Sequence, residues 1–242
     1  MESALLVHLE NIDVCQEENI VLNDASLTLY KGEFVYIIGK VGSGKSSLLK
    51  ALYCEVPILT GNAYVAGYDL LKIKRREIPY LRRKLGIVFQ DFQLLIDRTV
   101  NKNLEFVLKA TGWRKRCEIT NRIEEVLEQV GMQTKGYKMP HELSGGEQQR
   151  IAIARALLNK PEIILANEPT GHLDPETSGQ IVQLLHDIRH EGTAVIMSTH
   201  NYNIVKLFPA RVVKCESNRF YHVDNYSSLS YEETSFDATF DF

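Results

Sequence analysis

The chain alternates between two patterns of apolar residues. Short apolar runs of strand length are separated by longer stretches with helical spacing, such as i, i+3, i+4 and i+7 between Ile123 and Val130. This alternation predicts an α/β architecture. The predicted strands are residues 5–12, 26–30, 34–38, 85–89, 163–166, 194–198, 211–215 and 220–223. The predicted helices are residues 46–53, 75–84, 144–158 and 175–190, with further helix between residues 99 and 131 and from residue 202.

A glycine-rich segment joins the predicted strand 34–38 to the predicted helix 46–53. Residues 39–46 read Gly-Lys-Val-Gly-Ser-Gly-Lys-Ser, which fits the phosphate-binding pattern G-x-x-x-x-G-K-[ST] in the required strand–loop–helix context. Glycines let several backbone N–H groups point at an anion, and the helix N-terminus adds a positive dipole end. Lys45 would neutralise the outer phosphates, and the Ser46 hydroxyl would hold Mg²⁺, which prefers oxygen. The predicted nucleotide-binding residues here are Gly39, Lys40, Val41, Gly42, Ser43, Gly44, Lys45, Ser46 and Ser47.

A second candidate phosphate site opens the helix predicted at residues 144–158. Residues 143–150 read Leu-Ser-Gly-Gly-Glu-Gln-Gln-Arg, so Ser144, Gly145 and Gly146 lie at a helix N-terminus. One chain cannot easily direct the N-termini of both helices, the one at residues 46–53 and the one at residues 144–158, at a single nucleotide. The segment resembles the signature motif of ABC-type ATPases, and the resemblance extends to about Val223. It implies a head-to-tail homodimer in which each ATP lies between Lys45 of one copy and residues 144–146 of the other.

The resemblance implies further roles for residues near the ends of predicted strands. Gln90 matches a glutamine that touches Mg²⁺ or the attacking water and links the site to a membrane partner. Glu168 matches the catalytic carboxylate, which polarises a water in line with the γ-phosphate. His200 matches a histidine that contacts the γ-phosphate, and Asp174 belongs to a loop that crosses the dimer seam beside the nucleotide. The implied activity is ATP hydrolysis with ATP and Mg²⁺ bound, and Glu168, His200 and Gln90 as catalytic residues.

The resemblance also implies an architecture. It is an α/β fold, the P-loop NTPase type of ABC nucleotide-binding domain, with an antiparallel β subdomain and an inserted helical subdomain. The domain would span residues 1–224, with the helical subdomain at approximately 92–160. Residues 225–242 contain four acids and no Lys or Arg, and we predict that they form an acidic, loosely ordered tail.

Two positions depart from the family pattern. Asn167 stands where the family usually has an aspartate near Mg²⁺. The neutral amide lacks the close-range interaction between the aspartate charge and the metal, which contributes on the order of 1–4 kcal/mol. We therefore expect Ser46, Gln90 and Asn167 to hold Mg²⁺, with weaker Mg²⁺ retention and slower ATP turnover than in a protein with aspartate at position 167. The alternative is that neighbouring residues compensate for the substitution, so that it has no effect. Cys15 falls near the position of an adenine-stacking aromatic residue, which predicts loose selectivity between ATP and GTP.

Residues 76–100 narrow the resemblance to bacterial cell-division ATPases of the FtsE type, chiefly through the run Leu-Leu-Ile-Asp-Arg-Thr-Val at 94–100. That resemblance implies two copies of an FtsX-like integral membrane subunit, whose ATP-driven conformational change controls peptidoglycan hydrolysis in cell division. The implied location is cytoplasmic, peripheral on the inner face of the plasma membrane. Two alternatives stay open: a LolD/MacB-type ATPase for lipoprotein or efflux transport, and a slowly hydrolysing nucleotide-gated scaffold.

Composition and charge restrict the remaining functions. The chain is 44% hydrophobic and 24% charged, as is ordinary for globular proteins. A net charge of −3 gives no support to nucleic-acid binding as the main activity. No apolar run approaches the ~20 residues of a membrane span, and no basic region of a secretory signal precedes an apolar one. The four cysteines are scattered without a C-x-x-C pair, which indicates reduced thiols.

Two exposed surfaces are also candidates for contacts. Apolar residues at 92–96 are candidates for a groove that receives a short helix of the membrane partner, with core packing as the alternative. The basic run at 72–84 is a candidate for contact with anionic lipid, although a solvated helix face is the simpler interpretation. The apolar residues are Phe92, Leu94, Leu95 and Ile96.

Overall fold

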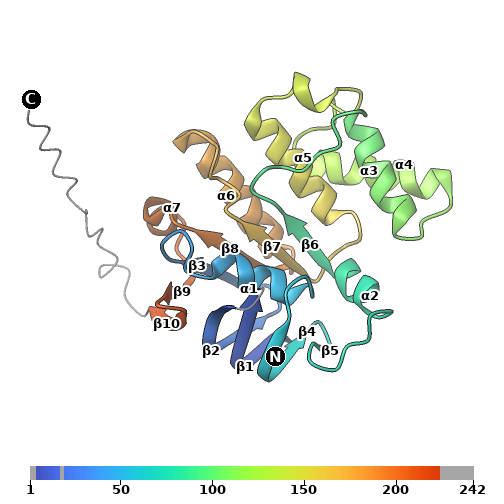
Figure 1. Ribbon diagram of the computed structural model, residues 1–242. Coiled ribbons are helices and arrows are strands. Elements are labelled where there is room, and N and C mark those ends of the chain that lie inside the picture. The colour runs from blue at the N-terminus through green and yellow to red at the C-terminus, as the bar shows by residue number, and fades with distance from the viewer. Residues whose placement is uncertain (1–3, 17–18, 224–242) are drawn as a thin grey trace, which may run out of the picture.

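The computed structural model describes residues 4–16 and 19–223, and a six-stranded sheet lies at its centre (Figure 1). The strand order is β10-β9-β3-β8-β7-β6, and every strand is parallel except β10, which pairs antiparallel with β9. The strands are β3 (Phe34–Ile38), β6 (Leu85–Val88), β7 (Ile163–Asn167), β8 (Ala194–Thr199), β9 (Arg211–Glu216) and β10 (Arg219–Val223). Both β3 and β8 are buried along their whole length, as is typical of a parallel sheet covered on both faces. We call the edge where the five parallel strands end the carboxyl edge, and the opposite one the amino edge.

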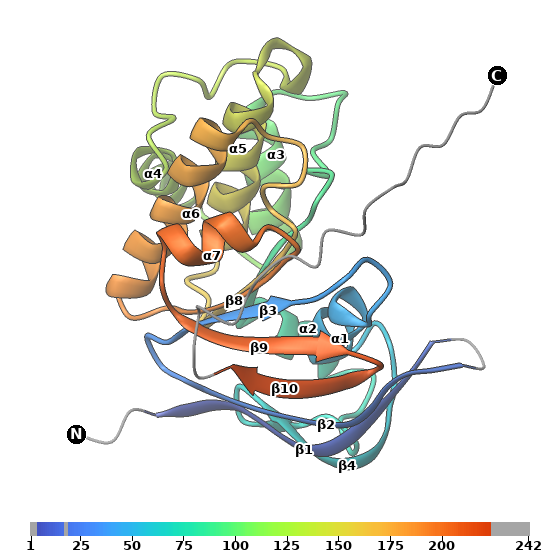
Figure 2. The same ribbon diagram turned by 90° about the vertical axis from the view of Figure 1, so that its left-hand side faces the viewer.

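A second, antiparallel sheet packs against one face of the central sheet (Figure 2). Its order is β2-β1-β4-β5. The strands are β1 (Leu5–Gln16), β2 (Asn19–Tyr30), β4 (Ile58–Val65) and β5 (Tyr68–Asp69). Helix α1 (Lys45–Leu52) lies between the two sheets, and one hydrophobic cluster joins all three through buried residues such as Val7, Val35 and Leu48. This packing holds the glycine-rich loop firmly between the two sheets.

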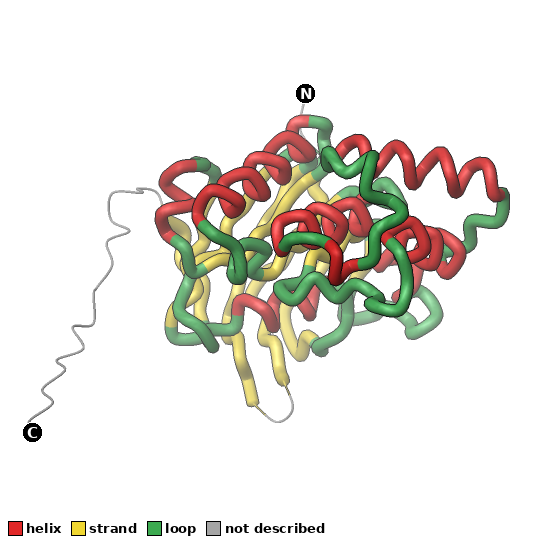
Figure 3. The backbone as a smooth tube through the Cα atoms, turned by 90° about the horizontal axis from the view of Figure 1, so that it is seen from above, coloured by secondary structure: helices red, strands yellow, loops and turns green. Residues whose placement is uncertain are grey.

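Helices cover the other face of the central sheet and extend to one side of it (Figures 1 and 3). The helices of the covering face are α6 (Pro175–His190) and α7 (Tyr202–Leu207). The extension is formed by α3 (Val100–Ala110), α4 (Arg116–Gln129), the 3₁₀ turn Pro140–Glu142 and α5 (Gly145–Leu157), all between β6 and β7 in sequence. One hydrophobic cluster unites these helices with the sheet through buried residues such as Leu104, Val126 and Ile151. None of the described helices is long and apolar enough to cross a bilayer.

The observed elements differ from the predicted ones mainly in the first third of the chain. The sequence pattern does not predict β4 or β5, because only Ala63 and Val65 of β4 are buried and the alternation is weak. The predicted strand 26–30 is the last part of the longer β2. The predicted helix 75–84 is the shorter α2 (Ile78–Arg83), which begins just before Pro79 because proline is tolerated only in the first turn of a helix.

Other predictions are confirmed or refined. The helical stretch between residues 99 and 131 divides into α3 and α4 around Gly112, whose φ is +105°. The predicted strands 211–215 and 220–223 are β9 and β10, which form a hairpin that turns at Ser217 and Asn218, with φ of +48° and +62°. Residues 225–242, predicted to form an acidic tail, lie outside the described residues, so the proposed limits of the domain stay a prediction.

Candidate functional site

Residues 39–44 connect β3 to α1 at the carboxyl edge (Figure 1). Gly39 and Gly44 have φ of +155° and +104°. A Cβ at Gly39 would lie 2.3 Å from the Cys215 carbonyl oxygen, and one at Gly44 would lie 2.7 Å from the Val21 carbonyl oxygen. Both positions require glycine because the backbone of another strand approaches too closely for a side chain. The loop is thereby held against β2 and β9 at the point where α1 begins, with the N–H groups of the first turn of α1 available to a phosphate.

The ammonium group of Lys45 lies over this loop. The residue is only 4% exposed, and its Nζ donates hydrogen bonds to the carbonyl oxygens of Gly39 (2.8 Å) and Lys40 (3.0 Å). The same Nζ lies 3.6 Å from Oε1 of Glu168. A buried cation is therefore balanced by two carbonyl dipoles and a carboxylate, and a phosphate entering the loop would compete with that carboxylate for the cation.

Asn167 ends β7 and accepts two hydroxyl hydrogen bonds. Its Oδ1 accepts from Ser46 Oγ at 2.9 Å and from Ser198 Oγ at 2.8 Å. The Ser198 hydroxyl also accepts from the backbone N–H of Glu168 at 3.1 Å. Because Ser198 is fully buried at the end of β8, it joins the two neighbouring strand ends into one network. Ser198 is not among the predicted site residues, although a polar residue in an otherwise apolar run is a signal, since buried hydroxyls need partners.

The chemistry of these donors fits Mg²⁺ held largely by a nucleotide. Ser46, Asn167 and Gln90 offer neutral oxygens, which are hard ligands. No group of three or more His, Cys, Asp or Glu residues in the described part of the chain is arranged to hold a metal ion. Mg²⁺ commonly uses one or two protein ligands together with water and phosphate oxygens, so this sparse set is compatible with it.

Glu168 follows β7 directly and is 7% exposed. Its φ of +46° is rare for a residue other than glycine, and such strain tends to persist at functional sites. Its Oε2 lies 2.8 Å from Nδ1 of His200, which is half-exposed, while Oε1 faces Lys45. The carboxylate thus lies between the buried ammonium and the imidazole, at the mouth of the loop. This arrangement suits a group that orients and polarises a water.

Gln90 lies just beyond β6 at the same edge. A Cβ at Gly171 would lie 3.4 Å from Gln90 Nε2, so the glutamine side chain packs against the loop that follows Glu168. The four parallel strands β6, β7, β8 and β3 therefore bring Gln90, Glu168, His200 and Lys45 to one edge, as expected for residues at strand ends. Their roles with nucleotide remain predictions.

The second predicted phosphate site is the N-terminus of α5. Ser144 caps the helix by accepting from Glu147 N (3.3 Å), and Glu147 Oε2 accepts from Ser144 N (2.9 Å), which forms a capping box. Ser144 is exposed, and Gly145 and Gly146 are half-exposed. Among the described residues, no hydrogen bond or ion pair joins residues 144–146 to residues 39–47. The helix end is therefore formed and open, and the two sites are separate within one chain.

Asp174, predicted to lie beside the nucleotide, is the N-cap of α6. Its Oδ1 accepts from Thr177 N at 2.9 Å, and hydrogen bonds from Thr177 hold the pKa of Asp174 below its ordinary value. The structure thus gives this carboxylate a local capping role. Any contact with nucleotide across a dimer stays a prediction.

The end of β1 lies close to the beginning of α1. Ser47 Oγ donates to Gln16 Oε1 at 3.0 Å, which places the neighbouring Cys15 near the loop. Cys15 is half-buried, and its backbone N–H donates to the Pro57 carbonyl at 3.3 Å. Cys15 thus lies near the loop, and the predicted loose selectivity between ATP and GTP stays a prediction.

Comparison with known sequences finds consistent similarity. A family model described as ABC transporter matches residues 22–171. The cell division ATP-binding protein FtsE of Streptococcus pneumoniae serotype 2 is 44% identical over 212 residues, which cover 88% of this chain and 92% of that protein. The FtsE protein of Bacillus subtilis is 45% identical over 195 residues, with coverage of 81% and 85%. That of Escherichia coli K12 is 40% identical over 184 residues, with coverage of 76% and 82%.

Comparison with solved structures finds the same fold. The dimeric post-hydrolysis state of the ATP-binding cassette MJ0796, bound to ADP and Pi, has a TM-score of 0.79 and 33% identity. That match covers 90% of this chain and 98% of the other. The cbiO1 protein of Clostridium perfringens, part of the ABC transporter complex cbiONQ, has a TM-score of 0.83, 28% identity and coverage of 91% and 88%.

Proposed function

Because this chain belongs to the ABC transporter family and is an ATPase similar to the FtsE cell-division proteins, we propose that two copies close head to tail around two ATP molecules. Each ATP would lie between Lys45 of one copy and residues 144–146 of the other. The observation that supports this most directly is the N-terminus of α5, which is capped and exposed but separate from the loop at residues 39–47. A dimeric relative with ADP and Pi has the same fold.

The groups at the carboxyl edge support a simple sequence of events for hydrolysis. Phosphate entering the loop would displace the Glu168 carboxylate from Lys45, because the ammonium gains a closer and more highly charged partner. Glu168 would then be free to accept a proton from a water placed in line with the γ-phosphate. His200, whose Nδ1 already lies 2.8 Å from Oε2 of Glu168, would contact both the carboxylate and the γ-phosphate and so fix their relative positions.

Ser46, Asn167 and Gln90 are the residues that we propose to hold Mg²⁺, which when bound neutralises charge on the β- and γ-phosphates. The Ser46 hydroxyl could offer an oxygen lone pair to the metal while its O–H still donates to Asn167, and Ser198 would keep the amide of Asn167 in place. Since Asn167 carries no charge, we propose that this site retains the metal less strongly than an aspartate would. Glu168 remains available for hydrolysis.

A groove beside the segment that follows Gln90 is the proposed docking site for the membrane partner. Leu95, Ile96 and Phe106 are 37%, 78% and 51% exposed. Next to them lies a cavity of about 340 Å³, lined by Arg98, Phe106 and charged residues of α3. Exposed apolar side chains with a charged rim suit a short amphipathic helix. Leu94 belongs instead to the core, and Phe92 lies near Gly145, so only part of the predicted groove is surface.

The loop between Gln90 and α3 is rigid enough to transmit a movement to that groove. Buried Asn103 accepts from Leu95 N (2.7 Å) and donates to the carbonyl oxygens of Leu95, Arg98 and Thr99. Arg155 of α5 donates to the Phe92 carbonyl at 2.8 Å and also to that of Gln93. A displacement of Gln90 or of α5 would therefore be carried to the groove as a unit.

We propose that the occupant of this groove is an integral membrane protein of the FtsX kind, in two copies, at the inner face of the plasma membrane. ATP closes the dimer only by binding the closed state more tightly, and hydrolysis removes that bias. The resulting cycle would switch the membrane protein and, through it, peptidoglycan hydrolases outside. The support is the similarity to FtsE proteins together with the exposed groove.

A nucleotide-gated scaffold is the second candidate, because Asn167 removes a charge from the proposed metal position. Steady-state phosphate release, with and without the membrane partner, separates the two functions. Release that Glu168→Gln abolishes supports the hydrolase. No release in either condition, with ATP-dependent dimerisation intact, favours the scaffold.

The identity of the partner is tested by purification of the chain from membranes. A co-purifying protein with a large external loop supports the cell-division system, whereas subunits of a lipoprotein-extraction or efflux system would overturn it.

The dimer is tested separately with Glu168→Gln in saturating ATP. A variant that stays monomeric in the presence of its membrane partner would contradict the composite site.

A further inference from the structure

The segment 72–84, which contains α2, is strongly basic and largely unpaired; we call it the basic segment. It holds seven Lys and Arg residues and one Glu. Lys72 pairs with Asp69 at 3.0 Å and Lys84 with Glu162 at 3.0 Å. Within the described residues, the other five cations form no ion pair, and Arg82 donates only to backbone carbonyls. These five are Lys74, Arg75, Arg76, Arg82 and Arg83.

Exposed apolar side chains lie in the basic segment or next to Lys72 at its start. Leu71, Tyr80 and Tyr64 are 41%, 57% and 44% exposed. The guanidinium of Arg83 lies 5.0 Å from the centroid of the Tyr80 ring. A surface of this kind favours a ligand that carries both acidic and aromatic side chains, because each finds a matching group.

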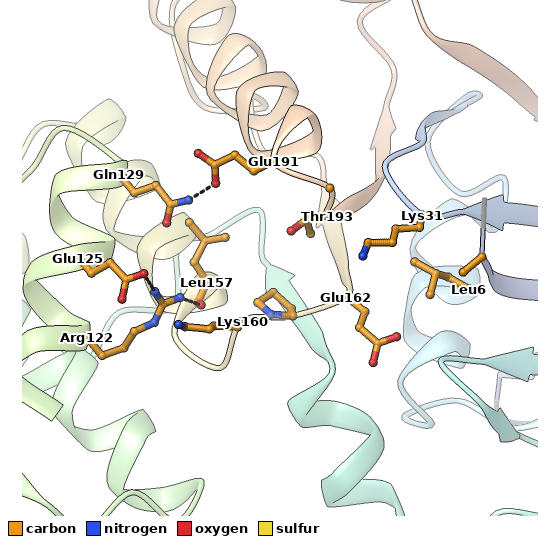
Figure 4. A pocket seen from close by; sticks show the side chains of 13 residues that line it. Leu6, Lys31, Arg122, Glu125, Gln129, Leu157, Lys160, Glu162, Glu191 and Thr193 are labelled. Atoms are coloured by element: carbon orange, nitrogen blue, oxygen red, sulfur yellow. Dashed lines mark hydrogen bonds and ion pairs between the residues drawn. The ribbon is translucent and has the colours of Figure 1, made fainter. Parts of the chain in front are cut away.

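A cleft lies on the amino edge of the central sheet (Figure 4). Its volume is about 570 Å³, and it lies where β3, β7 and β8 begin, between Lys31 and Thr193 on one side and the α4 residues on the other. Its wall includes Glu162, whose ion pair with Lys84 connects it to the end of α2. Two carboxylates of the cleft are balanced by cations, because Glu162 pairs with Lys84 and Glu125 with Arg122.

The chain that follows β10 has the matching composition. Residues 224–242 contain five acids and five aromatic residues, with no Lys or Arg. Val223, which directly precedes them, lies at the amino edge, since it pairs with Val212 at the start of β9. Five interstrand steps of about 4.8 Å, or about 24 Å in all, separate β10 from β6, which α2 precedes. Nineteen residues reach up to about 60 Å when extended, so the segment is long enough.

We propose that residues 224–242 dock along the amino edge of their own chain, pass the cleft and place their carboxylates on the basic segment. A short tether gives an effective concentration in the millimolar range, so even weak individual ion pairs produce substantial occupancy. The docked segment covers cations that otherwise attract an anionic surface. The basic segment is therefore an internal docking site whose occupancy falls with salt.

Carbodiimide cross-linking of the full-length chain tests this contact, because the reagent joins an amine to a carboxylate only when the two touch. We expect links from Lys72 or Lys74 to the acids of residues 224–242, with yield that falls as salt is raised. A mixture of ¹⁴N- and ¹⁵N-labelled protein should give links within one chain. Links formed only between chains, or none to the basic segment, overturn the proposal. The links should form without nucleotide, so their failure leaves the proposed ATPase function untouched.

Charge reversal provides the matched comparison. Arg75→Glu with Arg76→Glu should lower the yield of these links roughly tenfold, since two attractions become repulsions. The control, Arg114→Glu with Arg116→Glu, makes the same charge change on exposed residues at the start of α4 and should leave the yield unchanged. Equal yields in both variants overturn the proposal, and thermal unfolding confirms that both are folded.

An anionic membrane is the competing occupant. Vesicles that contain phosphatidylglycerol should bind more tightly to a variant with neutral Gln and Asn in place of Glu232, Glu233, Asp237 and Asp241, because its basic segment is uncovered. Equal vesicle binding by both chains, abolished by Arg75→Glu with Arg76→Glu, overturns the proposal and assigns the basic segment to a membrane.

Discussion

The two candidate phosphate sites of the chain differ in how fully their polar groups are satisfied. At the carboxyl edge, Lys45 and Glu168 are 4% and 7% exposed and face each other, and Asn167 accepts two hydroxyls. At the N-terminus of α5, Ser144 is exposed, and among the described residues its side chain hydrogen-bonds only within its own helix, to Glu147. The first site contains the groups that can react, whereas the second offers only a hydroxyl, backbone N–H groups and a dipole end.

This difference indicates that the two halves of a composite site would have different roles. The carboxyl edge must rearrange when phosphate enters, because Lys45 is already bound to two carbonyl groups and a carboxylate. The α5 end needs no rearrangement, since its cap is already formed. Nucleotide affinity should therefore depend mainly on the first site, and closure of the dimer on the second.

The largest effect should come from the reactive site. Glu168→Gln keeps the shape but removes the base, and we expect phosphate release to fall roughly 10²–10⁴-fold, the usual range for a general base. ATP-dependent dimerisation should persist, and light scattering checks it. Release that stays near the wild-type rate would exclude Glu168 as the catalytic carboxylate.

The division between the sites is tested by complementation. Lys45→Ala disables the first site and Ser144→Arg blocks the second, and each variant alone should be inactive. An equal mixture should recover up to about a quarter of the wild-type sites, because half of the dimers then hold one intact composite site. Phosphate release by the mixture measures this directly. No recovery from folded, dimerising variants would argue against head-to-tail pairing.

A smaller change is expected when charge is restored at the metal position. Asn167→Asp adds a carboxylate where Ser46 and Ser198 now donate, and we expect roughly tenfold tighter Mg²⁺ retention, at the low end of a close charge–charge interaction. Titration of Mg²⁺ against a fluorescent ATP analogue gives this affinity independently of turnover. Unchanged affinity and unchanged kinetics would indicate a tolerated substitution.

The smallest effect should come from the cap of the open site. Ser144→Ala removes the side-chain acceptor for Glu147 N and should destabilise the chain by about 1 kcal/mol. Thermal unfolding measures this loss. Dimerisation of the Glu168→Gln background should weaken when Ser144→Ala is added, whereas a change in stability alone would give Ser144 only a structural role.

Local patterns predicted a large part of the site. The loop at residues 39–46 follows from a strand, glycines at fixed spacing and a helix, all adjacent in the chain. The cap at Ser144 follows from its position before a helical run with Glu147 three residues later. Weakly patterned elements such as β4, with only two buried side chains, were missed. Asp174 was expected beside the nucleotide, and its capping of α6 became visible only in the folded chain.

The sequence by itself determined which chemical groups this protein has and which strand or helix end carries each of them, because those signals are local. Only the tertiary structure decided which groups meet: Ser198 reaches Asn167, and His200 reaches Glu168, because β8 lies beside β7 in the sheet. Strand order depends on packing between segments far apart in sequence, so no pattern along the chain specifies those contacts.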